Sequence, residues 1–175
     1  MSKTIPKEKG RRNRITGQLG EYLATAELAR HDYIVTTFAG NVPDFDVLAV
    51  DRKLRSIAIQ VKTIRGGSWQ FNARAYLDIS YKNEIQKIIG KKRLPNLDLI
   101  YIFVVLGKSY GQDDFYLIQR KAVREIIYKK YSQWLIEKKG RRPKNPESFH
   151  CGIEPKELIG YRDRWDLVAR AIQSK

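Results

Sequence analysis

Three polar residues on two neighbouring strand-like segments have the types and spacing that chemistry at a phosphate requires. Asp46 lies near the start of one apolar segment, residues 45–50, and Gln60 and Lys62 lie in a second, residues 56–63. A connection this short usually makes two strands adjacent and antiparallel. Side chains alternate along a strand, so Gln60 and Lys62 share one face. We therefore expect an aspartate, an amide and a lysine to converge beside otherwise apolar strands.

Each of these groups suits one part of a metal-assisted phosphodiester hydrolysis. Carboxylate and amide oxygens are ligands for Mg²⁺, which polarises a phosphoryl oxygen and lowers the pKa of a bound water. A lysine beside the metal stabilises transition-state charge or orients the attacking water. Glu21 lies on a helix-like segment that is apolar around most of its girth, where an unpaired charge would be costly. If that helix packs on the sheet, Glu21 adds a second carboxylate; the alternative is an ordinary surface ion pair.

The elements that must position these groups are a helix followed by three strands. Residues 16–30 carry apolar side chains at helical spacing. Residues 33–38 are rich in β-branched and aromatic types and precede the strands at 45–50 and 56–63.

The remainder of the chain predicts further strands and closing helices. Residues 97–106 read as a buried strand, 115–119 as its hairpin partner, and 120–138 as a helix. The less regular segments predict short strands within 69–79, a short helix at 82–89 and a partly helical ending at 154–174. This order predicts a mixed α/β domain around one sheet.

The run Pro43–Asp46, followed by Gln60-Val61-Lys62, resembles the PD-(D/E)XK nuclease superfamily. The preceding segment Gly17-Gln18-Leu19-Gly20-Glu21 resembles the first helix of archaeal Holliday junction resolvases and related nucleases. The resemblance covers residues 15–63 well and residues 97–119 in strand order. It implies a restriction-endonuclease-like αβββαβ core, a mixed sheet flanked by helices with a C-terminal helical extension, and Mg²⁺-dependent hydrolysis of DNA.

The resemblance also assigns roles to individual positions. The metal-binding aspartate falls on Asp46, with Asp44 as its rival because Asp44 directly follows Pro43. The catalytic lysine falls on Lys62 and the helix glutamate on Glu21. The candidate catalytic residues are Asp46, Gln60, Lys62 and Glu21, and the candidate metal ligands are Asp46, Gln60, Glu21 and Asp44.

Gln60 departs from the pattern, because an acidic residue usually stands two positions before the lysine. Some homing and restriction-type members have glutamine there, so the departure is compatible with activity. It removes one negative charge and is expected to lower metal affinity. Two hypotheses stay open: a Mg²⁺-dependent endonuclease, and a catalytically degenerate protein of the same fold that binds DNA or RNA without cleaving it.

The composition indicates a polyanionic partner. The 175 residues include 34 Lys and Arg against 19 Asp and Glu, a net charge of +15. A single cysteine excludes an internal disulfide, and two histidines exclude a three-histidine metal site. We expect DNA to be bound by basic clusters with strong salt dependence. The candidate phosphate contacts are Arg11, Arg12, Arg14, Lys91, Lys92, Arg93, Arg141 and Arg142.

The sequence predicts a basic flexible arm at 1–14, a nuclease-like core at 15–139 and a C-terminal extension packed on the core at 140–175. No apolar run approaches the roughly 18 residues of a membrane helix, and no apolar stretch follows the basic N-terminus as in a secretory signal. We therefore expect a cytoplasmic protein without a membrane partner. Mg²⁺, replaceable by Mn²⁺, is the expected cofactor, with no small-molecule cofactor. Two-fold symmetric DNA favours a homodimer or a dimer of dimers.

Overall fold

The computed structural model of the chain describes residues 6–38 and 44–174, with side chains described from residue 8 onwards. It divides into two compact units, each built from segments far apart in sequence. Unit 1 contains the residues up to 67, residues 99–118 and those from 158 on, and unit 2 contains 68–98 and 119–157. This division differs from the expected boundaries at 15 and 140, because strand pairing joins segments that are distant along the chain.

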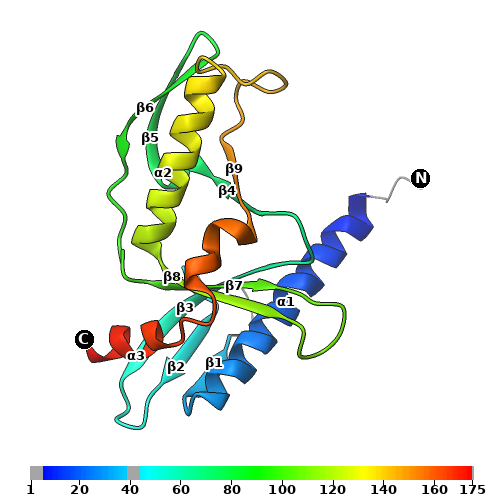
Figure 1. Cartoon of the computed structure of the whole chain (residues 1–175), viewed down its shortest axis with the longest axis vertical. Coiled ribbons are helices and arrows are strands. Elements are labelled where there is room, and N and C mark those ends of the chain that lie inside the picture. Colours follow the sequence, from blue (N-terminus) through cyan, green and yellow to red (C-terminus); the bar gives the residue numbers. More distant parts are fainter. Residues whose placement is uncertain (1–5, 39–43, 175) are drawn as a thin grey trace. The chain divides into compact units, whose positions relative to one another are not determined.

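Unit 1 is built on a five-stranded mixed sheet with the order β1-β2-β3-β7-β8 (Figure 1). β1 and β2 pair antiparallel, as do β2 and β3, whereas β3 and β7 run parallel. The three predicted strands after the first helix, the antiparallel pairing of the second with the third, and the two later strands are confirmed. The strands are β1 (Ile34–Thr37), β2 (Val47–Val50), β3 (Ser56–Ile64), β7 (Ile100–Val105) and β8 (Asp114–Gln119).

The first helix, α1 (Pro6–Arg30), packs against β1 and β3 and begins well before the predicted start at residue 16. Residues 6–14 are therefore helical, and the expected arm is wrong for them; residues 1–5 lie outside the described part. Proline suits the first turn of a helix, and lysine and arginine are good helix formers. A stretch of charged side chains has no apolar stripe, so hydrophobic periodicity could not reveal this helix.

Strand β3 separates an apolar face from a polar one. Ile57, Ile59 and Val61 are buried, while the alternate residues Gln60 and Lys62 are half-buried. The buried face joins one core with residues of α1, the neighbouring strands and the C-terminal helix α3 (Asp166–Gln173). That core includes Ala24, Leu28, Val47, Ala49, Ile100, Ile102, Val104, Leu117, Val168 and Ile172.

Unit 2 combines one long helix with two small antiparallel sheets. The helix α2 (Arg120–Glu137), as predicted, packs against β6 and β9 (Figure 1). One sheet pairs β4 (Trp69–Asn72) with β9 (His150–Ile153), and the other pairs β5 (Leu77–Lys82) with β6 (Ile85–Lys91). Two 3₁₀ turns complete the assignment: η1 (Ala73–Ala75), and η2 (Pro155–Tyr161), which follows β9.

The short helix expected at residues 82–89 is wrong, because this segment is a β-hairpin. Asn83 and Glu84 have φ values of 50° and 60° and form its two-residue turn, and Lys82 pairs with Ile85. The connection from β3 to the parallel strand β7 thus consists of short strands and a 3₁₀ turn. The mixed α/β class, with flanking helices and a C-terminal helix, is confirmed, but the inner helix of the αβββαβ order is replaced by this hairpin.

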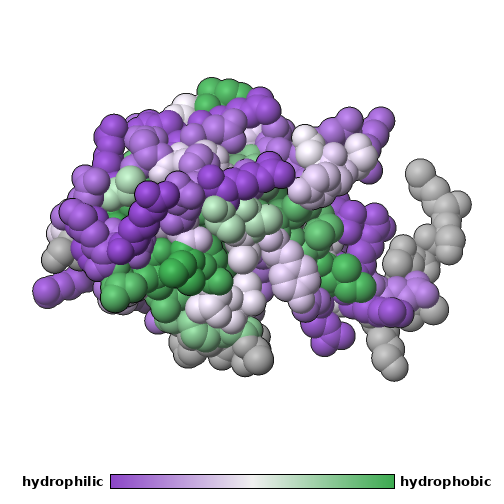
Figure 2. Space-filling view, turned by 90° about the horizontal axis from the view of Figure 1, so that it is seen from below, coloured by the Kyte–Doolittle hydropathy of each residue, from purple (hydrophilic) through white to green (hydrophobic). Residues whose placement is uncertain are grey.

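One face of the molecule is mainly hydrophilic. Figure 2 shows one face on which hydrophilic residues predominate, with smaller hydrophobic patches between them. Ile34 and Leu54 are among the exposed apolar side chains, and single exposed apolar residues are ordinary. Across the described residues, none of the helices combines the length and apolar character needed to cross a membrane.

Candidate active site

Asp46 lies immediately before β2 and is held by β3. Its backbone N–H donates to the carbonyl of Ile59 over 2.9 Å. One carboxylate oxygen, Oδ2, accepts a hydrogen bond from the backbone N–H of Val61 over 2.8 Å and another from the side-chain amide of Gln60. Charged acceptors make the stronger hydrogen bonds, so this carboxylate is held in one orientation. The structure thus brings Asp46 and Gln60 together, as the sequence predicts.

Glu21 on α1 interacts electrostatically with Asp46 and Lys62. Its side chain is half-buried, and burial raises the pKa of the carboxyl above its ordinary value of 4.5. The negative charge of Asp46 raises this pKa further, and the positive charge of Lys62 lowers it. The charges that act on Glu21 therefore belong to two other predicted site residues. Glu21, Asp46 and Lys62 form one electrostatic group.

A close contact between α1 and β3 sets the position of Glu21. A Cβ atom added at Gly20 would lie 1.7 Å from Oγ1 and 2.7 Å from Cβ of Thr63. Only glycine therefore permits this approach of the helix to the strand. The hydroxyl of Thr63 is buried and has no hydrogen-bond partner among the described residues. Sequence reasoning gave Gly20 no part in this contact; a helical glycine just before the glutamate is the signal that could have shown it.

Asp44 differs from Asp46 in its surroundings. It is exposed, and its φ of 74° lies in the left-handed region, which Asp tolerates better than most residues. β2 begins only at Val47, so the two aspartates, two residues apart, lie before this strand and not on one face of it. Pro43, which leads the motif, lies outside the described residues.

The donors present fit a hard divalent cation of the Mg²⁺ type. Within the described part of the chain, no group of three or more His, Cys, Asp or Glu is arranged to hold a metal ion. Mg²⁺ often binds through only one or two carboxylates and keeps several waters. Glu21 and Asp46 supply two carboxylates whose repulsion raises the pKa of Glu21, and a cation would relieve that repulsion. Gln60 adds an amide oxygen.

A basic groove of about 600 Å³ lies in unit 1 between α1 and the end of β3. Of the three predicted arginines on α1, Arg12 lines this groove, whereas Arg11 and Arg14 are exposed and do not line it. Sequence reasoning missed most of its lining, although the spacing of four of these positions is that of one helix face. The lining residues are Lys9, Arg12, Asn13, Thr16 and Thr63–Gly66.

The predicted phosphate contacts of unit 2 are largely engaged within the chain. Lys91 forms an ion pair with Glu125 over 2.5 Å, and Arg141 pairs with Glu84. Arg142 is half-buried, lies 4.6 Å from the ring centroid of Trp134 and donates to the carbonyl of His150. Lys92 and Arg93 are exposed. These contacts indicate a structural role for Arg142.

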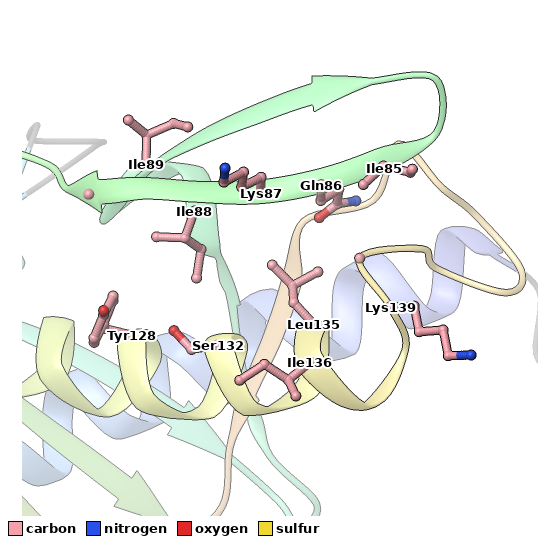
Figure 3. Close-up of a pocket in the computed structure, with 12 residues that line it drawn as sticks. Ile85, Gln86, Lys87, Ile88, Ile89, Tyr128, Ser132, Leu135, Ile136 and Lys139 are labelled. Atoms are coloured by element: carbon pink, nitrogen blue, oxygen red, sulfur yellow. The ribbon is translucent and has the colours of Figure 1, made fainter.

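A second hollow, of about 420 Å³, lies in unit 2 between β6 and α2. Figure 3 shows Ile88 pointing from β6 toward α2, where Leu135 and Ile136 lie, while Ile89 points away. The side chains lining it include no carboxylate. It therefore lacks the groups that metal-assisted hydrolysis needs, and the cluster in unit 1 remains the candidate site.

The sheet with its flanking helices has a counterpart among solved structures. A solved structure of a bacterial homing endonuclease, I-Ssp6803I, is similar to this chain with a TM-score of 0.53. The sequences are 12% identical, and the match covers 93% of this chain and 96% of that chain. At this identity the likeness shows the fold. No protein-family model and no curated protein matches the sequence.

Proposed function

We propose that the protein is a Mg²⁺-dependent DNA endonuclease whose site follows the PD-(D/E)XK pattern with glutamine in the acidic position. The observation that carries the proposal is the convergence of Asp46, Gln60 and the group of Glu21 and Lys62 in unit 1. The fold likeness to a homing endonuclease supports a nuclease activity and DNA as the substrate. The net charge of +15 supports a polyanionic substrate.

The residues divide the work by their chemistry. Asp46 and Glu21 would hold Mg²⁺ or Mn²⁺, with the amide oxygen of Gln60 as a neutral ligand. The ion, when bound, polarises a phosphoryl oxygen and makes a bound water more acidic. Lys62 would donate to the scissile phosphate and stabilise the negative charge that develops there. The carboxylate of Asp46 is already oriented by β3, so little reorganisation accompanies the reaction.

The experiment is a cleavage assay on supercoiled plasmid, with Mg²⁺ or with EDTA. The proposal expects nicking or linearisation that requires the metal and is lost in both Lys62→Ala and Asp46→Asn. Asp46→Asn keeps an acceptor for the hydrogen bond from Val61, so its fold should survive. Lys53→Ala, which removes an exposed lysine of the β2–β3 turn, is the matched control and should cleave normally.

The same assay decides between the two aspartates. Asp44→Asn removes the charge and keeps a residue type that tolerates the positive φ. Cleavage by Asp44→Asn at the normal rate supports Asp46 as the ligand. Loss of cleavage in Asp44→Asn but not in Asp46→Asn would assign the metal to Asp44.

Branched DNA is needed before a negative result is accepted, because a structure-specific nuclease leaves plain plasmid intact. A homodimer is part of the proposal, since paired sites suit two-fold symmetric DNA. Light scattering of the purified protein measures the mass against the monomer mass of 20.4 kDa. If the protein is a monomer that nicks one strand, the nuclease proposal stands and the homodimer proposal is wrong.

The second candidate is a protein of this fold that binds nucleic acid without cleaving it. One observation favours it: the described residues lack a cluster of three acidic or other metal-binding side chains. This candidate predicts tight, salt-dependent DNA or RNA binding, intact plasmid and branched DNA with both Mg²⁺ and Mn²⁺, and no effect of Lys62→Ala on binding that exceeds that of Lys53→Ala.

A further inference from the structure

We propose that the groove between α1 and the end of β3 binds the sugar-phosphate backbone of duplex DNA beside the candidate active site. The inference rests on the proposed function only in taking the neighbouring cluster as an active site, because DNA binding in the groove requires no cleavage. In this proposal a defined surface of unit 1 binds DNA, in place of the expected flexible arm. This surface, the α1–β3 groove, is lined by Lys9, Arg12, Asn13, Thr16 and Thr63–Gly66.

The helix contributes one face to this groove. Lys9, Arg12, Asn13 and Thr16 follow one another at intervals of three, one and three residues, the spacing of one side of an α-helix. Arg11 and Arg14 are excluded from this face by the same spacing. A straight helix face offers its side chains in a row, and a row of donors matches the regular repeat of phosphates along a strand.

The charges of the groove all have one sign. Lys9, Arg12 and Arg65 line it, and no acidic side chain does. Among the described residues, none of these three cations forms an ion pair with an acid. Cations of unit 2 such as Lys91 and Arg141 are paired instead. Uncompensated cations around a polar hollow are what a phosphate backbone neutralises.

The groove is built rather than a chance meeting of long side chains. Nε of Arg65 donates to Oγ1 of Thr16 over 3.0 Å, which orients the guanidinium beside α1. Thr16 itself is buried. An arginine held by Nε keeps its remaining N–H groups for an anion, and Arg suits phosphate because of its planar array of donors.

The residues that line the groove adjoin those of the candidate site along both elements. Thr63, which lines the groove, follows Lys62 in β3, and the two side chains point to opposite faces of the strand. On the helix side, Thr16 lies one turn before Gly20, which touches Thr63 and precedes Glu21. A strand seated in the groove would therefore run toward the cluster of Glu21, Asp46 and Lys62. Phosphates flanking the reacting one would fix its position.

The test measures DNA binding in EDTA, so that cleavage plays no part. Fluorescence anisotropy of a labelled duplex gives the dissociation constant between 50 and 200 mM salt. The variant Lys9→Ala/Arg12→Ala changes only exposed helix positions, and alanine favours the helix. Its salt slope is expected to fall by about 2, roughly 1 for each lost phosphate contact. Over this salt range the wild type should then lose about 10-fold more affinity than the variant.

The matched control is Lys53→Ala/Lys108→Ala, which removes the same charge from exposed positions of unit 1 outside the groove. Its salt slope should stay at the wild-type value. An unchanged slope in Lys9→Ala/Arg12→Ala, or an equal fall in the control, would overturn the groove. Adding Arg65→Gln to the first variant should lower the slope by about 1 more.

The groove and the nuclease fail separately. If the wild-type protein binds DNA through the groove but never cleaves it, the nuclease proposal is wrong and the groove proposal stands. If the wild type cleaves DNA and Lys9→Ala/Arg12→Ala binds and cleaves it normally, the groove proposal is wrong and the nuclease proposal stands. A slope change seen with an RNA duplex and not with DNA would overturn the assignment to DNA.

Discussion

The side-chain amide of Gln60 donates a hydrogen bond to Oδ2 of Asp46, the same carboxylate oxygen that accepts from the backbone of Val61. A glutamate at position 60 could not make this contact, because two carboxylates would face each other. Glutamine thus stabilises the arrangement before any cation binds. The cost is one negative charge, so metal affinity should be lower than in a site with a third acid.

Gln60→Glu should lower the stability of the protein without metal and raise its affinity for Mg²⁺. In EDTA, loss of the hydrogen bond and the added repulsion should lower the free energy of unfolding by about 1–3 kcal/mol. Mg²⁺ should recover that loss, and half-maximal cleavage should need less Mg²⁺ than in the wild type. Urea denaturation with and without Mg²⁺, together with a Mg²⁺ titration of cleavage, measures both. Gln60→Ala is the control; a Mg²⁺ requirement that is the same in Gln60→Glu and wild type would contradict the metal role.

Lys62→Ala should reduce the single-turnover cleavage rate by about 10²–10³-fold, the usual effect of removing one donor to a developing negative charge. The free energy of unfolding should change little, because Lys62 is only half-buried. Removing its positive charge should also raise the pKa of Glu21 further. Lys53→Ala tests whether the loss is specific, and equal losses in the two variants would remove Lys62 from the mechanism.

The raised pKa of Glu21 predicts a definite dependence of stability on pH. A carboxyl with a folded-state pKa above 4.5 binds protons more tightly in the native state than in the unfolded one. The free energy of unfolding should therefore fall as pH rises from below 4.5 through the raised pKa, and then level off. Glu21→Gln should be more stable than the wild type near pH 7.5, with the difference vanishing below about pH 4.

Urea denaturation of both proteins at several pH values measures this effect. Glu21→Gln should also weaken the response of stability to Mg²⁺, because one of the proposed ligands loses its charge. A constant stability difference across the whole pH range would show that burial and Asp46 do not disfavour the charged form of Glu21.

Gly20→Ala should destabilise the protein by about 1–3 kcal/mol or more, because the new Cβ would overlap Thr63. It should also reduce cleavage by displacing Glu21 from the site. Gly17→Ala is the matched control on the same helix, since nothing lies within 4 Å of its added Cβ. That variant should gain up to about 1 kcal/mol from helix propensity. Similar effects of the two substitutions would argue against the close contact of α1 with β3.

Thr63→Ala in the Gly20→Ala background should restore part of the lost stability. It removes Oγ1, the nearest atom at 1.7 Å, but leaves Cβ of residue 63 at 2.7 Å. Thermal unfolding of the single and double variants measures the coupling between the two positions. A purely additive result would place the damage elsewhere.

Gln86 should be the polar residue on which the folding of unit 2 depends most. It is only 2% exposed, and its amide donates to the carbonyls of Pro146 and Ser148 over 2.5 and 3.1 Å. The hydroxyl of Tyr131 donates to its oxygen. Gln86→Ala should cost about 1–3 kcal/mol and expose residues 140–149 to protease and hydrogen exchange. Tyr131→Phe should show a smaller effect, and unchanged exchange in Gln86→Ala would contradict this role.

Local sequence signals located most of the elements of unit 1. β-Branched and aromatic residues identified β1, a short apolar run identified β2, and the periodicity of apolar side chains identified the core-facing side of β3. The same signal failed at residues 82–89, where Ile85, Ile88 and Ile89 have helical spacing but lie on a hairpin strand. The hairpin forms because two consecutive residues, Asn83 and Glu84, adopt left-handed backbone conformations. Glutamate is not among the residues typical of such a turn, so the sequence did not predict it.

The sequence by itself determined the net charge, which depends only on composition. It also determined that Gln60 and Lys62 share a strand face and that Asp46 lies beside them, because these features depend on alternation and on contacts between adjacent strands. Only the tertiary structure decided that α1 approaches β3 closely enough to deliver Glu21, and that Lys9, Arg12 and Arg65 line one groove. Those relationships join residues more than 40 positions apart. The close packing of the helix backbone at Gly20 against the side chain of Thr63 sets the approach of α1 to β3, and no local pattern encodes that distance.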